Sequence, residues 1–111
     1  MRIYLEFLGC RLNEAELSSW RRQVLSSGGT VVSTPEEADI LTVNTCAVSK
    51  QATRKSKQKL RSLHRRNPKA KLVATGCYAT LEPERLKQSL GVDLLVPNDQ
   101  KDSLVPLIRS E

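Results

Sequence analysis

Short apolar runs alternate with amphipathic stretches along the chain. The runs occupy residues 2–8, 30–33, 39–44, 71–75 and 92–96 and are rich in Val, Ile and Leu. Continuous apolar runs of this length, bounded by Gly, Pro, Asn or Asp, are typical of strands in a parallel sheet. The pattern therefore predicts five strands, and we expect the first of them to be buried on both faces.

The stretches between these runs carry apolar residues at helical spacing. The first predicted helix begins near Asn13, which is favoured as its N-cap over a group that faces a ligand. It ends before Gly28, because glycine readily adopts the conformation that closes a helix. Its buried face is expected to hold four residues: Leu17, Trp20, Val24 and Leu25.

Three further helices are expected, at residues 48–66, 82–90 and 99–109. Strands and helices that alternate in this way form right-handed crossovers and a parallel sheet covered by helices on both faces. The predicted fold is therefore a five-stranded α/β domain, flavodoxin-like or Rossmann-like. The favoured arrangement of its strands is 2-1-3-4-5.

Length and composition narrow the class of protein. At 111 residues, the chain is expected to be one domain, residues 1–111. No apolar stretch approaches the roughly 20 residues that cross a bilayer. The acidic Glu6 interrupts the first apolar run, so a secretory signal is not expected either. We expect a cytoplasmic protein with no membrane partner.

The excess of positive charge lies in one segment. The chain has 18 basic and 12 acidic residues, a net charge of +6, and eight of the basic residues fall between residues 48 and 66 without an acidic one. Such a run is either a solvated helix face or a surface that contacts nucleic-acid phosphates. We favour contact with RNA through five candidates: Lys50, Arg54, Lys55, Lys57 and Arg61.

Each of the three cysteines stands just beyond a predicted strand. Cys10, Cys46 and Cys77 follow the first, third and fourth strands, and parallel strands end at the edge where open α/β sheets bind ligands. Because neighbouring strands are about 5 Å apart, thiols distant in sequence can converge there. Gly9 and Gly76 directly precede two of the cysteines and allow close approach of a bulky cluster.

From the residues alone, two interpretations of the cysteines are open. Cysteine is often a small buried hydrophobic residue. As ligands, three thiolates without a C-x-x-C pair do not suit structural zinc, whereas a 4Fe–4S cluster held by three thiolates keeps one iron open. Asn44 and Thr45 are candidate hydrogen-bond donors to cluster sulfides. The single histidine, His64, is expected at the opposite edge of the sheet.

The motifs around the cysteines resemble a known family. The strings LGCRLNEAE, ADILTVNTCAVSKQATRKSKQKL and VATGCYA are similar to the N-terminal domain of methylthiotransferases, which add a methylthio group to tRNA adenosines or to a ribosomal protein. The resemblance covers nearly the whole chain. It implies that Cys10, Cys46 and Cys77 bind an auxiliary 4Fe–4S cluster whose open iron carries the sulfur that is transferred.

In that family, two more domains accompany this one: a radical S-adenosylmethionine barrel with a second 4Fe–4S cluster, and a C-terminal RNA-binding domain. Neither is present in the chain, so the resemblance implies part of an enzyme that is inactive alone. The implied partners are those two domains and the anticodon region of tRNA. The segment NTCAVSKQATRKSKQ looks most like the branch that acts on threonylcarbamoyladenosine, with the isopentenyladenosine and ribosomal-protein branches as alternatives.

The sequence also bears on functions outside this family. The sequence has no Ser/His/Asp set and no Gly-rich phosphate loop, which argues against hydrolysis. Two alternatives outside the family are a non-catalytic RNA-binding α/β module with structural cysteines and an electron-transfer protein with a fully ligated cluster. Tyr78, directly after Cys77, is a candidate either for a substrate pocket or for packing.

Overall fold

The computed structural model describes residues 2–8, 11–46, 49–81, 83–89 and 91–96, together with Leu104 and Ile108. Every predicted strand is present within two residues of its expected bounds. The elements are, in chain order, β1 (Arg2–Phe7), α1 (Arg11–Ser26), β2 (Thr30–Val32), the 3-10 turn η1 (Pro35–Glu37), β3 (Ile40–Thr45), α2 (Lys50–Arg66), β4 (Lys71–Gly76), α3 (Cys77–Leu81), α4 (Pro83–Ser89) and β5 (Leu94–Val96).

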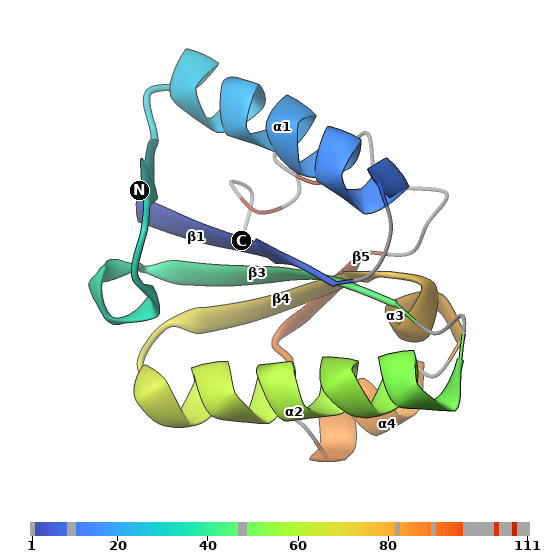
Figure 1. Ribbon diagram of the computed structural model, residues 1–111. Helices are drawn as coiled ribbons and strands as arrows, with labels where there is room; N and C mark the ends of the chain where they lie inside the picture. The colour runs from blue at the N-terminus through green and yellow to red at the C-terminus, as the bar shows by residue number, and fades with distance from the viewer. Residues whose placement is uncertain are drawn as a thin grey trace.

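The five strands form one parallel sheet in the order β2-β1-β3-β4-β5. This is the predicted arrangement, and the α/β class is confirmed. Helix α1 covers one face of the sheet, and α2 and α4 cover the other (Figure 1). The chain must cross a face between neighbouring strands because parallel strands cannot be joined by a tight turn.

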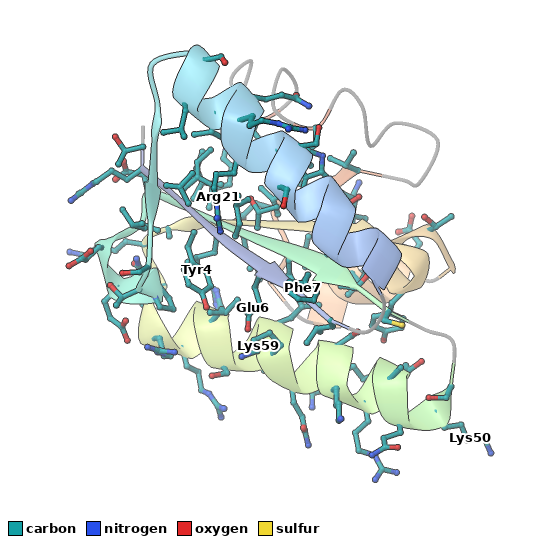
Figure 2. All side chains as sticks on the ribbon, turned by 45° about the horizontal axis from the view of Figure 1, so that its top comes forward. Tyr4, Glu6, Phe7, Arg21, Lys50 and Lys59 are labelled. Carbon is teal, nitrogen blue, oxygen red and sulfur yellow. The ribbon has the colours of Figure 1, made fainter. Side chains whose placement is uncertain are left out.

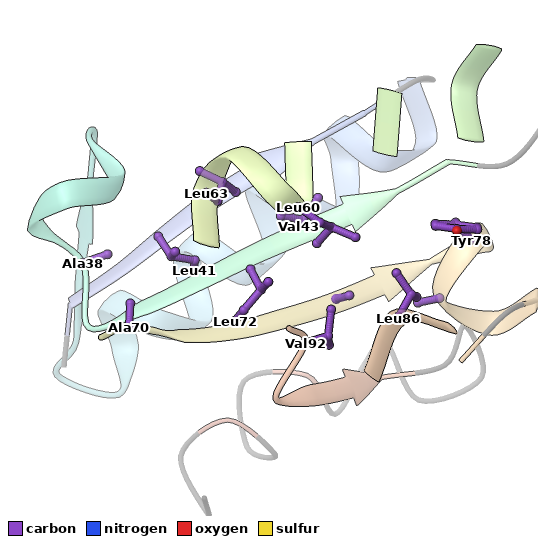
Figure 3. Close-up of a cluster of buried hydrophobic side chains, with 12 residues drawn as sticks. Ala38, Leu41, Val43, Leu60, Leu63, Ala70, Leu72, Tyr78, Leu86 and Val92 are labelled. Atoms are coloured by element: carbon purple, nitrogen blue, oxygen red, sulfur yellow. The ribbon is translucent and has the colours of Figure 1, made fainter. Parts of the chain in front are cut away.

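Two apolar clusters attach the helices to the sheet. On the α1 face, Trp20 and Val24 pack with Ile3 of β1. On the other face, Leu60 and Leu63 of α2 pack against the side chains of β3 and β4 (Figure 3). β3 is buried along its whole length, as a strand covered by helices on both faces should be.

Helix α1 and strand β1 differ from the sequence prediction. The helix begins at Arg11, so Asn13 lies within its first turn and is not the N-cap. Leu25 is 56% exposed, because successive helical residues point about 100° apart and Val24 already faces the sheet. The prediction that β1 is buried on both faces is wrong: of its six residues only Ile3 is buried, and Phe7 at its end is 36% exposed.

Helix α3 was not predicted from the sequence. It starts directly beyond Gly76, whose φ of +96° redirects the chain. Of the helix expected at residues 99–109, only Leu104 and Ile108 are described, and both are helical and buried. No helix in the described part of the chain is long and apolar enough to cross a membrane.

Candidate cysteine site at the carboxyl edge of the sheet

Strands β3 and β4 end side by side, and each is followed by a cysteine. Thr45 of β3 is in register with Gly76 of β4. The next residues, Cys46 and Cys77, therefore leave neighbouring strands at the same level. Only the backbone of Cys77 is described, whereas the Cys46 side chain is described as a buried free thiol.

Strand β1 reaches the same edge on the other side of β3. Phe7 is in register with Asn44, and the Leu8 N–H donates a 3.0 Å hydrogen bond to the Asn44 carbonyl. Cys10 follows two residues later and lies outside the described residues. The chain segments that carry all three cysteines are thus attached to the carboxyl ends of three adjacent strands.

The backbone of Cys46 is fixed to α2 by a single hydroxyl. Ser56 accepts a hydrogen bond from the Cys46 N–H at 3.0 Å and donates one to the Cys46 carbonyl at 2.9 Å. Both residues are buried. Ser56 is not among the site residues predicted from the sequence, because it lies in a highly charged helix. Its spacing from Ala52, Leu60 and Leu63 nevertheless places it on the apolar face of that helix.

A second hydroxyl connects β3 to the helix that begins at Cys77. Thr45 Oγ1 donates to the Thr75 carbonyl at 2.6 Å and accepts from the Ala79 N–H at 3.2 Å. It thereby satisfies one of the N–H groups that the first turn of a helix leaves unpaired. The Thr45 hydroxyl proton is used inside the sheet, so its expected role as a donor to a cluster sulfide is wrong.

The position before Cys77 accepts only glycine. Gly76 has a φ of +96°, a conformation that L side chains rarely adopt. A Cβ there would overlap the Thr45 carbonyl oxygen and lie 2.6 Å from Asn44 Oδ1. The glycine therefore permits β3 and β4 to approach closely at the edge where their cysteines emerge.

A hollow of about 320 Å³ opens beside Cys46, between the end of β1 and the first turns of α2. Its volume is at the lower end of the range for small-ligand pockets. Apolar and polar side chains share its wall. The lining residues are Phe7, Leu8, Cys46, Ser49, Gln51, Ala52 and Lys55.

Tyr78 and His64 do not belong to this site. Tyr78 is 1% exposed in the core beneath α2, with the Lys57 ammonium 6.0 Å from its ring centroid. Of its two candidate roles, packing is therefore the one observed. His64 is exposed in the last turn of α2, whereas the helix begins at Lys50, after its N-cap Ser49, near Cys46.

Ion pairs occupy the α2 side of β1. Glu6 accepts a hydrogen bond from the Tyr4 hydroxyl at 3.0 Å and pairs with Lys59 at 2.9 Å (Figure 2). Burial, and then the negative charge of Glu6, raise the pKa of Tyr4 to about 12. Further along the helix, Arg66 forms two hydrogen bonds with Glu36, which lower the pKa of that carboxyl.

Among the described residues, the carboxylate and imidazole groups considered as ligands are either engaged elsewhere or distant from the cysteine edge. Glu6, the carboxylate of β1, is engaged by Lys59, and His64 lies at the other end of α2. Among the described side chains, no three His, Cys, Asp or Glu gather at one point. Cys46 is the one cysteine with a described side chain, so the set of three thiolates stays a prediction from the sequence. Such a set would hold a 4Fe–4S cluster with one iron free of cysteine.

Residues 2–97 match the family described as "Uncharacterized protein family UPF0004". The chain is 39% identical over 108 residues to the threonylcarbamoyladenosine tRNA methylthiotransferase MtaB of Aquifex aeolicus, covering 97% of this chain and 26% of that protein. It is 35% identical over 98 residues to the tRNA-2-methylthio-N(6)-dimethylallyladenosine synthase of Thermotoga petrophila, covering 86% and 22%. The chain thus spans about a quarter of the length of these relatives.

Solved structures with little sequence identity share the fold. A pilus assembly protein (cpaE) of Burkholderia thailandensis matches with a TM-score of 0.65 at 15% identity, covering 100% of this chain and 99% of that one. A CheY-like protein (tadZ) of Pseudomonas aeruginosa matches with a TM-score of 0.61 at 18% identity, covering 99% and 93%. These similarities support the flavodoxin-like arrangement of the sheet.

Proposed function

Because the chain belongs to the UPF0004 family, we propose that it is the cluster-binding domain of a tRNA-modifying methylthiotransferase. The observation that carries the proposal is the junction of β3 and β4, where Cys46 and Cys77 follow residues paired in register. The similarity to tRNA methylthiotransferases over 97% of the chain supports the same conclusion.

In this function, Cys10, Cys46 and Cys77 hold an auxiliary 4Fe–4S cluster. When bound, the cluster supplies the sulfur that is transferred, through the iron that no cysteine holds. The chain's own part is positional: Ser56 fixes the Cys46 backbone, and Gly76 keeps the approach to Cys77 clear of side chains.

The proposed substrate is threonylcarbamoyladenosine beside the tRNA anticodon, since several of the similar relatives are MtaB enzymes. The synthase that acts on dimethylallyladenosine supports the isopentenyladenosine branch as a second candidate. The complete enzyme then contains the radical S-adenosylmethionine barrel and its second cluster. Contact with tRNA is assigned to five residues of α2: Lys50, Arg54, Lys55, Lys57 and Arg61.

Anaerobic iron and sulfide analysis of the complete protein tests this function. Replacing Cys10, Cys46 or Cys77 singly by Ala is expected to remove the irons of one cluster from each variant. The matched control Ser62→Ala lies on α2 outside the site and is expected to keep them. Full iron content in all three cysteine variants would refute the proposal, and a wild-type protein that cannot be reconstituted with a cluster would favour a module with structural cysteines.

A further inference from the structure

Five basic residues of α2 form one line along the helix. They follow one another at intervals of four, three, four and four residues, which keeps them on one face of a helix with about 3.6 residues per turn. At about 1.5 Å per residue, the line extends for about 22 Å. We call these residues the outer stripe: Lys50, Arg54, Lys57, Arg61 and Arg65.

The other three basic residues of α2 lie on a different side of the helix, and two of them are neutralised. Lys59 pairs with Glu6 at 2.9 Å, and Arg66 pairs with Glu36 at 2.7 Å. In the described ranges, no carboxylate forms an ion pair with a residue of the outer stripe. The structure thus divides a uniform run of charge into a neutralised side and a second side on which Lys50, Arg54, Arg61 and Arg65 are exposed. Lys57, on the same second side, is half-buried, with its ammonium 6.0 Å from the centroid of the Tyr78 ring.

The outer stripe begins at the cysteine edge and leads away from it. Lys50 is the first residue of α2, four residues beyond Cys46, and extends from the end of the helix into solvent (Figure 2). Arg65 lies in the last turn, at the opposite end. A shallow hollow of about 300 Å³ opens on the first half of the stripe, lined by Lys50, Thr53, Arg54 and Lys57.

We infer that the outer stripe is the track that binds the phosphates of the RNA strand on one side of the reacting nucleotide. The inference rests on the proposed function, which supplies RNA as the ligand. A row of cations contacts phosphates irrespective of sequence, and no residue of the outer stripe has an aromatic ring on which bases could stack. Lys55 lines the hollow beside Cys46 and so faces the reacting nucleotide rather than the track.

The test compares two groups of variants in the complete protein, with an anticodon stem-loop RNA as the probe. The first group is Arg54→Gln, Arg61→Gln and Arg65→Gln, singly and together. The matched controls are Lys59→Gln and Arg66→Gln, which remove the same charge from the neutralised side of the same helix. Dissociation constants are measured over a series of salt concentrations, and circular dichroism checks that each variant is folded.

Each substitution in the outer stripe is expected to weaken RNA binding several-fold. It should also reduce the steepness with which the logarithm of the binding constant falls with the logarithm of the salt concentration. The expected reduction is about 0.7, the value for one phosphate contact with a single-stranded nucleic acid. The controls are expected to retain the wild-type slope. Equal effects in both groups would overturn the track. Stripe variants that bind RNA normally but have a lower melting temperature would also overturn it, because they would give the stripe a role in stability instead.

The same measurements separate this inference from the proposed function. A wild-type protein that does not bind the RNA would contradict both. A wild-type protein that binds RNA, with stripe variants that bind equally well, would contradict the track alone. Iron content, determined on the same preparations, reports on the cluster independently of either result.

Discussion

Ser56 holds both main-chain polar groups of Cys46 with one hydroxyl. The hydroxyl accepts from the Cys46 N–H at 3.0 Å and donates to its carbonyl at 2.9 Å. The basic helix α2 is thereby joined to the residue that follows β3 and is a candidate cluster ligand. Displacement of α2 relative to the sheet must therefore move the Cys46 backbone with it.

Ser56→Ala is expected to lower the free energy of unfolding by about 1–3 kcal/mol, because it leaves a buried N–H and a buried carbonyl without a partner. Urea unfolding followed by the fluorescence of Trp20, the single and buried tryptophan, measures the change. Ser62→Ala on the same helix is the control and should change stability by no more than about 0.5 kcal/mol. Equal changes in the two variants would show that the hydrogen bonds to Cys46 do not stabilise the fold.

Gly76→Ala is expected to destabilise the protein more than Gly28→Ala does. Both glycines have positive φ, so both substitutions carry a backbone strain of about 1–3 kcal/mol. Only at Gly76 does the added Cβ also meet Thr45 and Asn44, whereas nothing lies within 4 Å at Gly28. The difference between the two melting temperatures measures this overlap, and identical values would contradict it.

Tyr4 is expected to make stability fall with rising pH between about 10 and 12. Its pKa is raised from 10.0 to about 12 in the folded state, so the unfolded chain loses the phenol proton first. The stabilisation is complete below pH 10 and is lost as the pH rises through the folded pKa. Unfolding free energies of wild type and Tyr4→Phe, compared at pH 8 and pH 11, should converge at the higher pH. A constant difference would indicate an ordinary pKa for Tyr4.

Leu60→Ala and Leu25→Ala are expected to differ strongly although the chemical change is the same. Leu60 is fully buried between α2 and the sheet, and its truncation should cost about 2–5 kcal/mol. Leu25 is 56% exposed, so its truncation should stay within about 0.5 kcal/mol. Urea midpoints distinguish the two cases, and a large loss at Leu25 would place that side chain in an interface.

The sequence was sufficient to predict the class of fold and that Cys46 and Cys77 follow neighbouring strands at one edge of the sheet. Short apolar runs with Gly or Pro at their ends reflect local backbone preferences, so they identify the strands. The alternation of these strands with helices then leaves few possible topologies for the sheet. The same local information misplaced Leu25 and Asn13 and missed α3. The errors at Leu25 and Asn13 depend on how α1 is rotated and where it begins, and α3 depends on the positive φ of Gly76. Neither feature is visible in the periodicity of apolar residues.

The sequence by itself determined that Cys46 and Cys77 follow strands and that α2 is basic, because strand ends and charge runs are properties of neighbouring residues. Only the tertiary structure decided that Ser56 is buried against Cys46 and that Lys59 is neutralised by Glu6. Those pairs are 10 and 53 residues apart in the chain. Contacts of this kind form when the elements pack, so the spacing of residues along one helix does not specify them.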